Sequence, residues 1–91
     1  MGDVVSAKDK LLNRLLSNPK DFTFDELATL LGSLGYELLS AGNTSGSAVK
    51  FRNPHTSHVI RLHKPHPSPV LKQYLIKFII NELRTGGFLD E

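Results

Sequence analysis

Residues 48–64, AVKFRNPHTSHVIRLHK, decide how this chain folds. Apolar and polar residues alternate from Val49 to Arg52 and again from Ile60 to His63, which is the period of a strand with one buried face. The Asn-Pro step between the two segments favours a turn. We therefore expect strands over Ala48–Arg52 and His58–Lys64, joined as an antiparallel hairpin by a turn over Asn53–Ser57.

The alternation assigns the side chains of this hairpin to two faces of a sheet. The apolar face, expected to point toward the core, carries Val49, Phe51, Ile60 and Leu62. The opposite face, here called the basic face, carries Lys50, Arg52, Arg61 and His63. A sheet with one apolar and one basic face suits helices that pack on one side only.

Another strand is expected before the hairpin, over Tyr36–Ala41, followed by the small polar loop Gly42–Ser47. Both connections in this region are short, and short connections join neighbouring strands. The three strands should therefore form an antiparallel meander.

Helices are expected on both sides of this sheet in the sequence. The first covers Ala7–Ser17, where leucines recur at helical spacing. The second begins at the capping box that starts with Thr23. It ends before Gly35, a natural left-handed stop. The last covers Pro69–Thr85, with Ser68 as its cap and proline at its preferred first position.

These elements predict an α+β protein with the order α(α)-βββ-α, a three-stranded antiparallel sheet and helices on one face. We expect a single domain over residues 1–91, with 1–19 as an additional N-terminal helix. Most of the last helix is apolar, beyond what one sheet face needs, so the N-terminal helices or a partner protein should cover the rest.

The distribution of charge favours a ligand that carries phosphates. Residues 38–81 contain six Lys and Arg residues, all four histidines and no acidic residue, whereas residues 1–37 contain six acids and four bases. An acid-free stretch of this length can present an uncompensated positive surface. The segment Lys64–Ser68 adds basic groups at the expected start of the last helix, where free amides also favour an anion.

Several other classes of protein are excluded or disfavoured. The chain has no cysteine, which excludes disulfides, thiolate metal sites and a cysteine nucleophile. No apolar run is long enough to span a membrane and no signal peptide is evident, so we expect a cytoplasmic protein without a membrane partner. The two His-x-x-His pairs have no carboxylate nearby in sequence, so we expect neither a metal nor another cofactor.

Three stretches resemble the HicA family of toxin mRNA interferases, which have a fold similar to double-stranded-RNA-binding domains. They are DELATLLGSLGYE (25–37), GSAVKFRNP (46–54) and HKPHPSP (63–69), the last followed by a long helix. The similarity covers residues 20–85. It implies an RNA-binding protein of a type II toxin–antitoxin system that cleaves mRNA without a metal and is held by a HicB-type antitoxin.

The resemblance also assigns residues. It carries over Lys50 and Arg52 as basic contacts and Ser47 as a loop residue, and the charge pattern adds Arg61 and Lys64 as candidates for RNA binding. The family's catalytic histidine follows the Gly-Ser pair by two positions, which is Val49 here, so no catalyst carries over. The nearest candidates for a catalytic base are His63 and His66, since imidazole can accept a proton near neutral pH.

Two other interpretations remain open. The chain could be an RNA-binding module of the same fold that does not cut RNA. It could also be a protein-interaction domain whose apolar C-terminal helix docks a partner.

Overall fold

The computed structural model describes residues 7–40, 48–65 and 67–89. In chain order its elements are α1 (Ala7–Leu16), α2 (Phe24–Ser33), β1 (Glu37–Ser40), β2 (Ala48–Arg52), β3 (Val59–His63) and α3 (Gln73–Thr85). The strands form one antiparallel sheet in the order β1-β2-β3. The expected α+β class and the meander are therefore confirmed.

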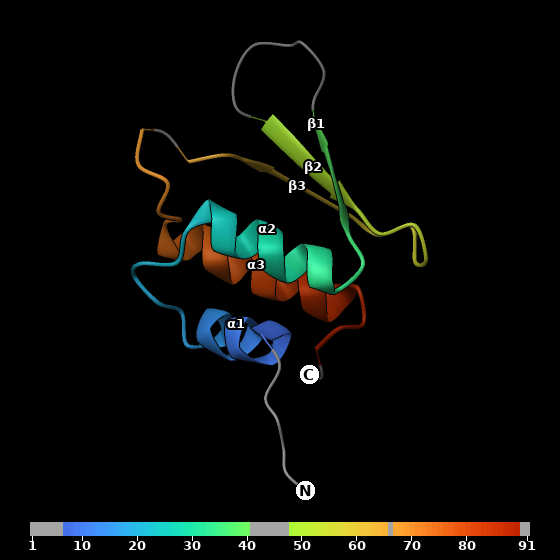
Figure 1. Ribbon diagram of the computed structural model, residues 1–91, viewed down its shortest axis with the longest axis horizontal. Helices are drawn as coiled ribbons and strands as arrows, with labels where there is room; N and C mark the ends of the chain where they lie inside the picture. Colours follow the sequence, from blue (N-terminus) through green and yellow to red (C-terminus); the bar gives the residue numbers. More distant parts are fainter. Residues whose placement is uncertain (1–6, 41–47, 66, 90–91) are drawn as a thin grey trace, which may run out of the picture.

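The helices lie on one side of the sheet, as expected (Figure 1). α2 and α3 lie between the sheet and α1, and α1 contacts both of them. The additional N-terminal helix thus forms an outer layer, and none of the helices that the structure describes covers the opposite face of the sheet.

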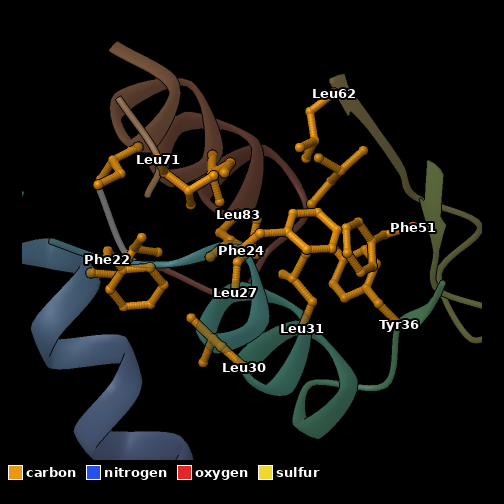
Figure 2. Close-up of a cluster of buried hydrophobic side chains, with 14 residues drawn as sticks. Phe22, Phe24, Leu27, Leu30, Leu31, Tyr36, Phe51, Leu62, Leu71 and Leu83 are labelled. Atoms are coloured by element: carbon orange, nitrogen blue, oxygen red, sulfur yellow. The ribbon is translucent and has the colours of Figure 1, made fainter. Parts of the chain in front are cut away.

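One hydrophobic core joins the three helices to β2 and β3. Phe51 of β2 and Leu62 of β3 reach toward Phe24 at the start of α2 (Figure 2). The rings of Phe24 and Phe51 have centroids 6.1 Å apart. Leu15 of α1 is fully buried in the same core. Each such side chain contributes roughly 1.5–3 kcal/mol through its removal from water.

Both ends of α2 form as the sequence predicts. The Glu26 backbone N–H donates to Thr23 Oγ1 (3.2 Å), and the Thr23 N–H donates back to Glu26 Oε1 (2.9 Å). This backbone donor, with the Arg14 guanidinium, lowers the pKa of Glu26 against the opposing effect of burial. At the other end Gly35 has φ of 100°, the left-handed conformation of a helix stop.

The turn between β2 and β3 is tied to the end of α2 by Asn53, whose side chain is 1% exposed. Asn53 Nδ2 donates to the carbonyl of Leu34 (3.2 Å). Its Oδ1 accepts from the backbone N–H groups of His55 (2.9 Å) and Thr56 (3.3 Å). The predicted turn is therefore also the contact that positions the hairpin over the helices.

The start of the last helix is a correction to the sequence prediction. α3 begins at Gln73 rather than Pro69, and its N-cap residue, Lys72, makes no capping bond with its side chain. Ser68 does not cap this helix; its Oγ accepts instead from the N–H of Val70 (3.2 Å).

The reason for the late start is an extended pairing with the segment that precedes α2. The Pro69 carbonyl accepts the N–H of Phe24 (2.9 Å), and the Leu71 N–H donates to the carbonyl of Phe22 (2.8 Å). The first bond satisfies an N-terminal amide of α2 that has no partner within the helix. The pairing also buries Leu71 to 1% exposure, so core packing outweighs the preference of proline for a helix start.

The other boundaries differ by one residue. Ser17 follows α1, Tyr36 precedes β1, and His58 and Lys64 flank β3 rather than belonging to it. Ala41, at the expected end of the first strand, lies outside the described residues.

The surface of α3 is covered only in part by the rest of the chain. Ile76, Ile79 and Leu83 are fully buried, whereas Tyr74 is 71% exposed and Phe78 is 40% exposed. Within the described ranges, no helix has the length and apolar character needed to cross a membrane.

Candidate nucleic-acid interface

The strand register brings the basic side chains of β2 and β3 together on the open face of the sheet. Lys50 lies directly opposite Arg61, and His63 lies opposite Ala48. Arg61 and His63 are exposed. Cross-strand neighbours on one face have Cβ atoms roughly 4.5–5.5 Å apart, so Lys50 and Arg61 place two positive charges at adjacent positions.

The edge of this face differs from what the charge pattern predicts. Arg52, at the end of β2, lies opposite Glu37 of β1. The acid-free stretch begins one residue after Glu37, so a count along the sequence misses this neighbour. The uncompensated charge therefore centres on Lys50, Arg61 and His63, with Arg52 at its margin.

The centre of the basic face, formed by Lys50, Arg61 and His63, has no counter-charge among the described residues. In the part of the chain that the structure describes, no hydrogen bond or ion pair engages the side chains of Lys50, Arg52, Arg61 or His63. Like charges directly opposite one another destabilise a sheet when nothing lies between them. An anionic ligand would remove that repulsion.

Two hollows meet at His63. The sheet hollow, of about 310 Å³, is lined by Ala48, Val49, Lys50, Arg61, Leu62 and His63. The helix hollow, of about 370 Å³, is lined by His63, Lys64, Ser68, Lys72 and Tyr74, with Pro65, Pro67, Val70 and Leu75. His63 lines both, so the end of β3 lies at the border between a hollow on the sheet and a hollow at the start of α3.

Of the remaining sequence candidates, Lys64 lies beside the helix hollow. Its Nζ is 5.2 Å from the centroid of the Phe24 ring, a cation–π contact. Ser47 and His66 lie outside the described residues. The anion site expected where Ser68 would start the last helix is not formed in that way, because the helix begins at Gln73.

Val49 faces the other way from the basic side chains. It is partly buried and packs against the core, as the strand alternation predicts. A valine has no group that can accept or donate a proton. The position at which the sequence resemblance would place a catalytic histidine therefore has no acid–base chemistry in this chain.

A second histidine cluster escaped the sequence analysis. Tyr36 Oη lies 2.6 Å from Nδ1 of His58, and His58 Nε2 lies 3.1 Å from Oε1 of Glu82. Because a carboxylate can only accept, Nε2 carries a proton, and in the neutral ring Nδ1 accepts from the tyrosine. Burial, followed by the Glu82 charge, raises the pKa of Tyr36 to about 12.

Tyr36 is nearly buried in this cluster, at 4% exposure, whereas the side chains of His58 and Glu82 are 16% and 25% exposed. Its three members are 22 and 24 residues apart in sequence, so no local motif could reveal it. Lys72 and Tyr74 of the helix hollow were also missed. The signal was present, because an aromatic residue follows a lysine closely at the start of an otherwise apolar helix.

No metal site is found within the described ranges, where no three His, Asp or Glu side chains lie close enough to share an ion. Comparison of the chain with models of protein families found no match. Searches of curated proteins and of solved structures found no match either.

Proposed function

We propose that this protein binds RNA through its basic face and acts as a HicA-like toxin of a type II toxin–antitoxin system. The observation that carries the proposal is the Lys50–Arg61 pair, two cations directly opposite each other on an open face without an acidic partner among the described residues. The basic side chains of this face, from a stretch without acids, suit a phosphate backbone. The motif resemblance to the HicA family supports the choice of RNA.

Retention of labelled RNA tests the binding. Bound phosphates release counterions, so affinity should fall steeply with salt, by a log–log slope of about 0.7 per phosphate contact on a single strand. The double variant Lys50→Gln/Arg61→Gln should therefore bind more weakly and lower that slope by about 1.4.

The matched control is Lys10→Gln/Lys20→Gln, which removes the same charge from exposed positions on α1 and in the loop between α1 and α2, outside the basic face. It should keep nearly the wild-type affinity and slope. Equal losses in the two double variants would show that net charge alone, and not the basic face, attracts RNA.

The family resemblance extends the proposal to cleavage, with His63 or His66 as the base. Cleavage without a metal requires a base that removes the proton of a ribose 2′-hydroxyl, whose oxygen then attacks the adjacent phosphorus to form a 2′,3′-cyclic phosphate. The 5′-oxygen is displaced and takes a proton from the protonated imidazole or from water. His63 borders both hollows and shares a face with Lys50 and Arg61, whose charges would stabilise the phosphorane.

RNA integrity is read in the same assay, with a metal chelator present. His63→Ala or His66→Ala should abolish cleavage and leave the thermal unfolding midpoint unchanged. Intact cleavage in both variants would eliminate these assignments. Salt-sensitive retention of intact RNA by the wild-type protein would instead identify an RNA-binding module that does not cut.

A second candidate function is protein interaction through α3, which the resemblance assigns to a HicB-type antitoxin. The exposure of Tyr74 and Phe78, one turn apart on that helix, favours it. The protein product of an adjacent small open reading frame should then co-purify as a stable complex. Monomeric protein in its presence, measured as solution mass, would contradict the antitoxin assignment.

A further inference from the structure

We propose that the helix hollow is a nucleotide site, in which the ring of Tyr74 stacks on one unpaired base of single-stranded RNA. This inference rests on the proposed function and specifies its substrate as unpaired rather than double-stranded RNA. It is carried by the composition of the hollow and by its connection to the basic face.

Tyr74 is the first part of the argument. At 71% it has the highest exposure of the large apolar residues that the structure describes, whereas the chain's other tyrosine, Tyr36, is 4% exposed. Exposed aromatic side chains beside cations are the usual stacking platforms for single-stranded nucleic acids, because every base has a π-face. Tyr74 lines the helix hollow, so a base on its ring would lie inside it.

The size and walls of the hollow are the second part. Its volume of about 370 Å³ lies in the range of small-ligand sites. Lys64 and Lys72 line it and supply two cations for the phosphates that flank a stacked base. The contact with the Phe24 ring holds the Lys64 ammonium at this wall.

The third part is the shared border at His63. A strand whose phosphates contact Lys50 and Arg61 in the sheet hollow can pass His63 and place its next bases beside Tyr74. A base held in a duplex cannot present its face to a side chain without unstacking. The site therefore selects single strands and unpaired loops.

Tyrosine fluorescence offers a direct probe, because the chain has two tyrosines and no tryptophan. Octauridylate should quench the emission of exposed Tyr74 as it binds, while a blunt RNA duplex of equal charge should not. Tyr74→Phe should keep the affinity measured with labelled octauridylate and lose most of the quenching.

The affinity test compares Tyr74→Leu with the control Phe78→Leu, one turn further along the same helix and outside the hollow. Leucine keeps the apolar character but has no π-face. Tyr74→Leu should weaken octauridylate binding roughly tenfold and leave binding of a matched abasic strand unchanged. Phe78→Leu should change neither.

The outcomes separate this inference from the proposed function. Unchanged octauridylate binding by Tyr74→Leu, with loss of binding by Lys50→Gln/Arg61→Gln, would overturn the nucleotide site and keep the basic face as the RNA surface. Equal losses in Tyr74→Leu and Phe78→Leu would also overturn it, because they would indicate a general role of the α3 surface. If the wild-type protein binds neither octauridylate nor the RNA duplex, the proposed function itself is overturned.

Discussion

The two ends of β3 each have a histidine, and the two have opposite environments. His58, just before the strand, has a side chain 16% exposed and both ring nitrogens within hydrogen-bond distance of a partner. His63, the last residue of the strand, is exposed, and among the described residues its ring has no hydrogen-bond partner. The same residue type thus stabilises the fold at one end and remains available to a ligand at the other.

The difference follows from what covers each end of the strand. At the His58 end, Glu82 of α3 and Tyr36, which precedes β1, converge on the imidazole. At the His63 end the residue directly opposite is Ala48, and the next cross-strand pair on that face is Lys50 and Arg61, so no acidic partner reaches the imidazole there among the described residues. Buried polar groups that are fully satisfied specify a fold, whereas unpaired cations on an open surface are available for recognition.

The largest effect on stability is expected for His58→Ala. The substitution leaves the nearly buried Tyr36 hydroxyl without its hydrogen-bond partner. It also removes the imidazole that pairs with the partly buried Glu82 carboxylate, and it leaves a cavity where the ring was. The free energy of unfolding should fall by about 2–4 kcal/mol, measured by chemical denaturation.

The matched variant at the other end of β3, His63→Ala, should change the free energy of unfolding by less than about 0.5 kcal/mol, because the His63 side chain is exposed. A comparable loss in both variants would remove the distinction between the two ends.

The second-largest effect is expected at alkaline pH, which should reduce the stability that the Tyr36–His58–Glu82 cluster gives to the fold. The raised pKa of Tyr36, about 12 against an ordinary value of 10, means that the folded state keeps the tyrosine proton where the unfolded chain has lost it. Stability from this group is therefore complete below pH 10 and is lost as the pH rises from 10 to 12, by about 2 kcal/mol.

Tyr36→Phe is the comparison for that measurement. It should be less stable than the wild type near neutral pH, and the difference between the two proteins should shrink between pH 10 and 12. A difference that stays constant over this window would show that the hydroxyl is not held neutral by the fold.

The third effect is the opposite change in stability expected when Gly86 and Gly32 are each replaced by alanine. A Cβ at Gly86 would lie 2.8 Å from His58 Nδ1 and 3.1 Å from Tyr36 Oη, so Gly86→Ala should displace the cluster and cost about 1–2 kcal/mol. A Cβ at Gly32 in α2 meets nothing within 4 Å, so Gly32→Ala should raise stability by about 0.5–1 kcal/mol. Thermal unfolding of both variants checks the pair, and a stabilising Gly86→Ala would contradict the close packing around His58.

Sequence reasoning succeeded where the signal is local. The capping box at Thr23 and the stop at Gly35 depend on neighbours within one helical turn, and β2 follows from its own alternation. The two faces of the hairpin, including the inward position of Val49, follow from the same period.

Sequence reasoning failed where segments that are distant along the chain lie in contact. Nothing near Pro69 indicates that its carbonyl accepts from Phe24, 45 residues earlier, and that bond belongs to the pairing that delays α3. Register likewise places Glu37 opposite Arg52, which no count of charges along the chain reveals. The candidate site was therefore predictable as a set of basic residues, but its centre and the hollow at Tyr74 were not.

The smallest effect on stability concerns the basic face and links it to function. Arg61→Glu replaces the repulsion opposite Lys50 with an attraction, so the free energy of unfolding should rise by a few tenths of a kcal/mol. RNA binding should be lost at the same time, because a carboxylate would occupy the place of a phosphate. Lys10→Glu, the same charge change on an exposed residue of α1, the helix that α2 and α3 separate from the sheet (Figure 1), should alter neither quantity appreciably. If Arg61→Glu lowers stability, the two cations do not repel each other in the free protein, and the observation that supports the RNA surface loses its force.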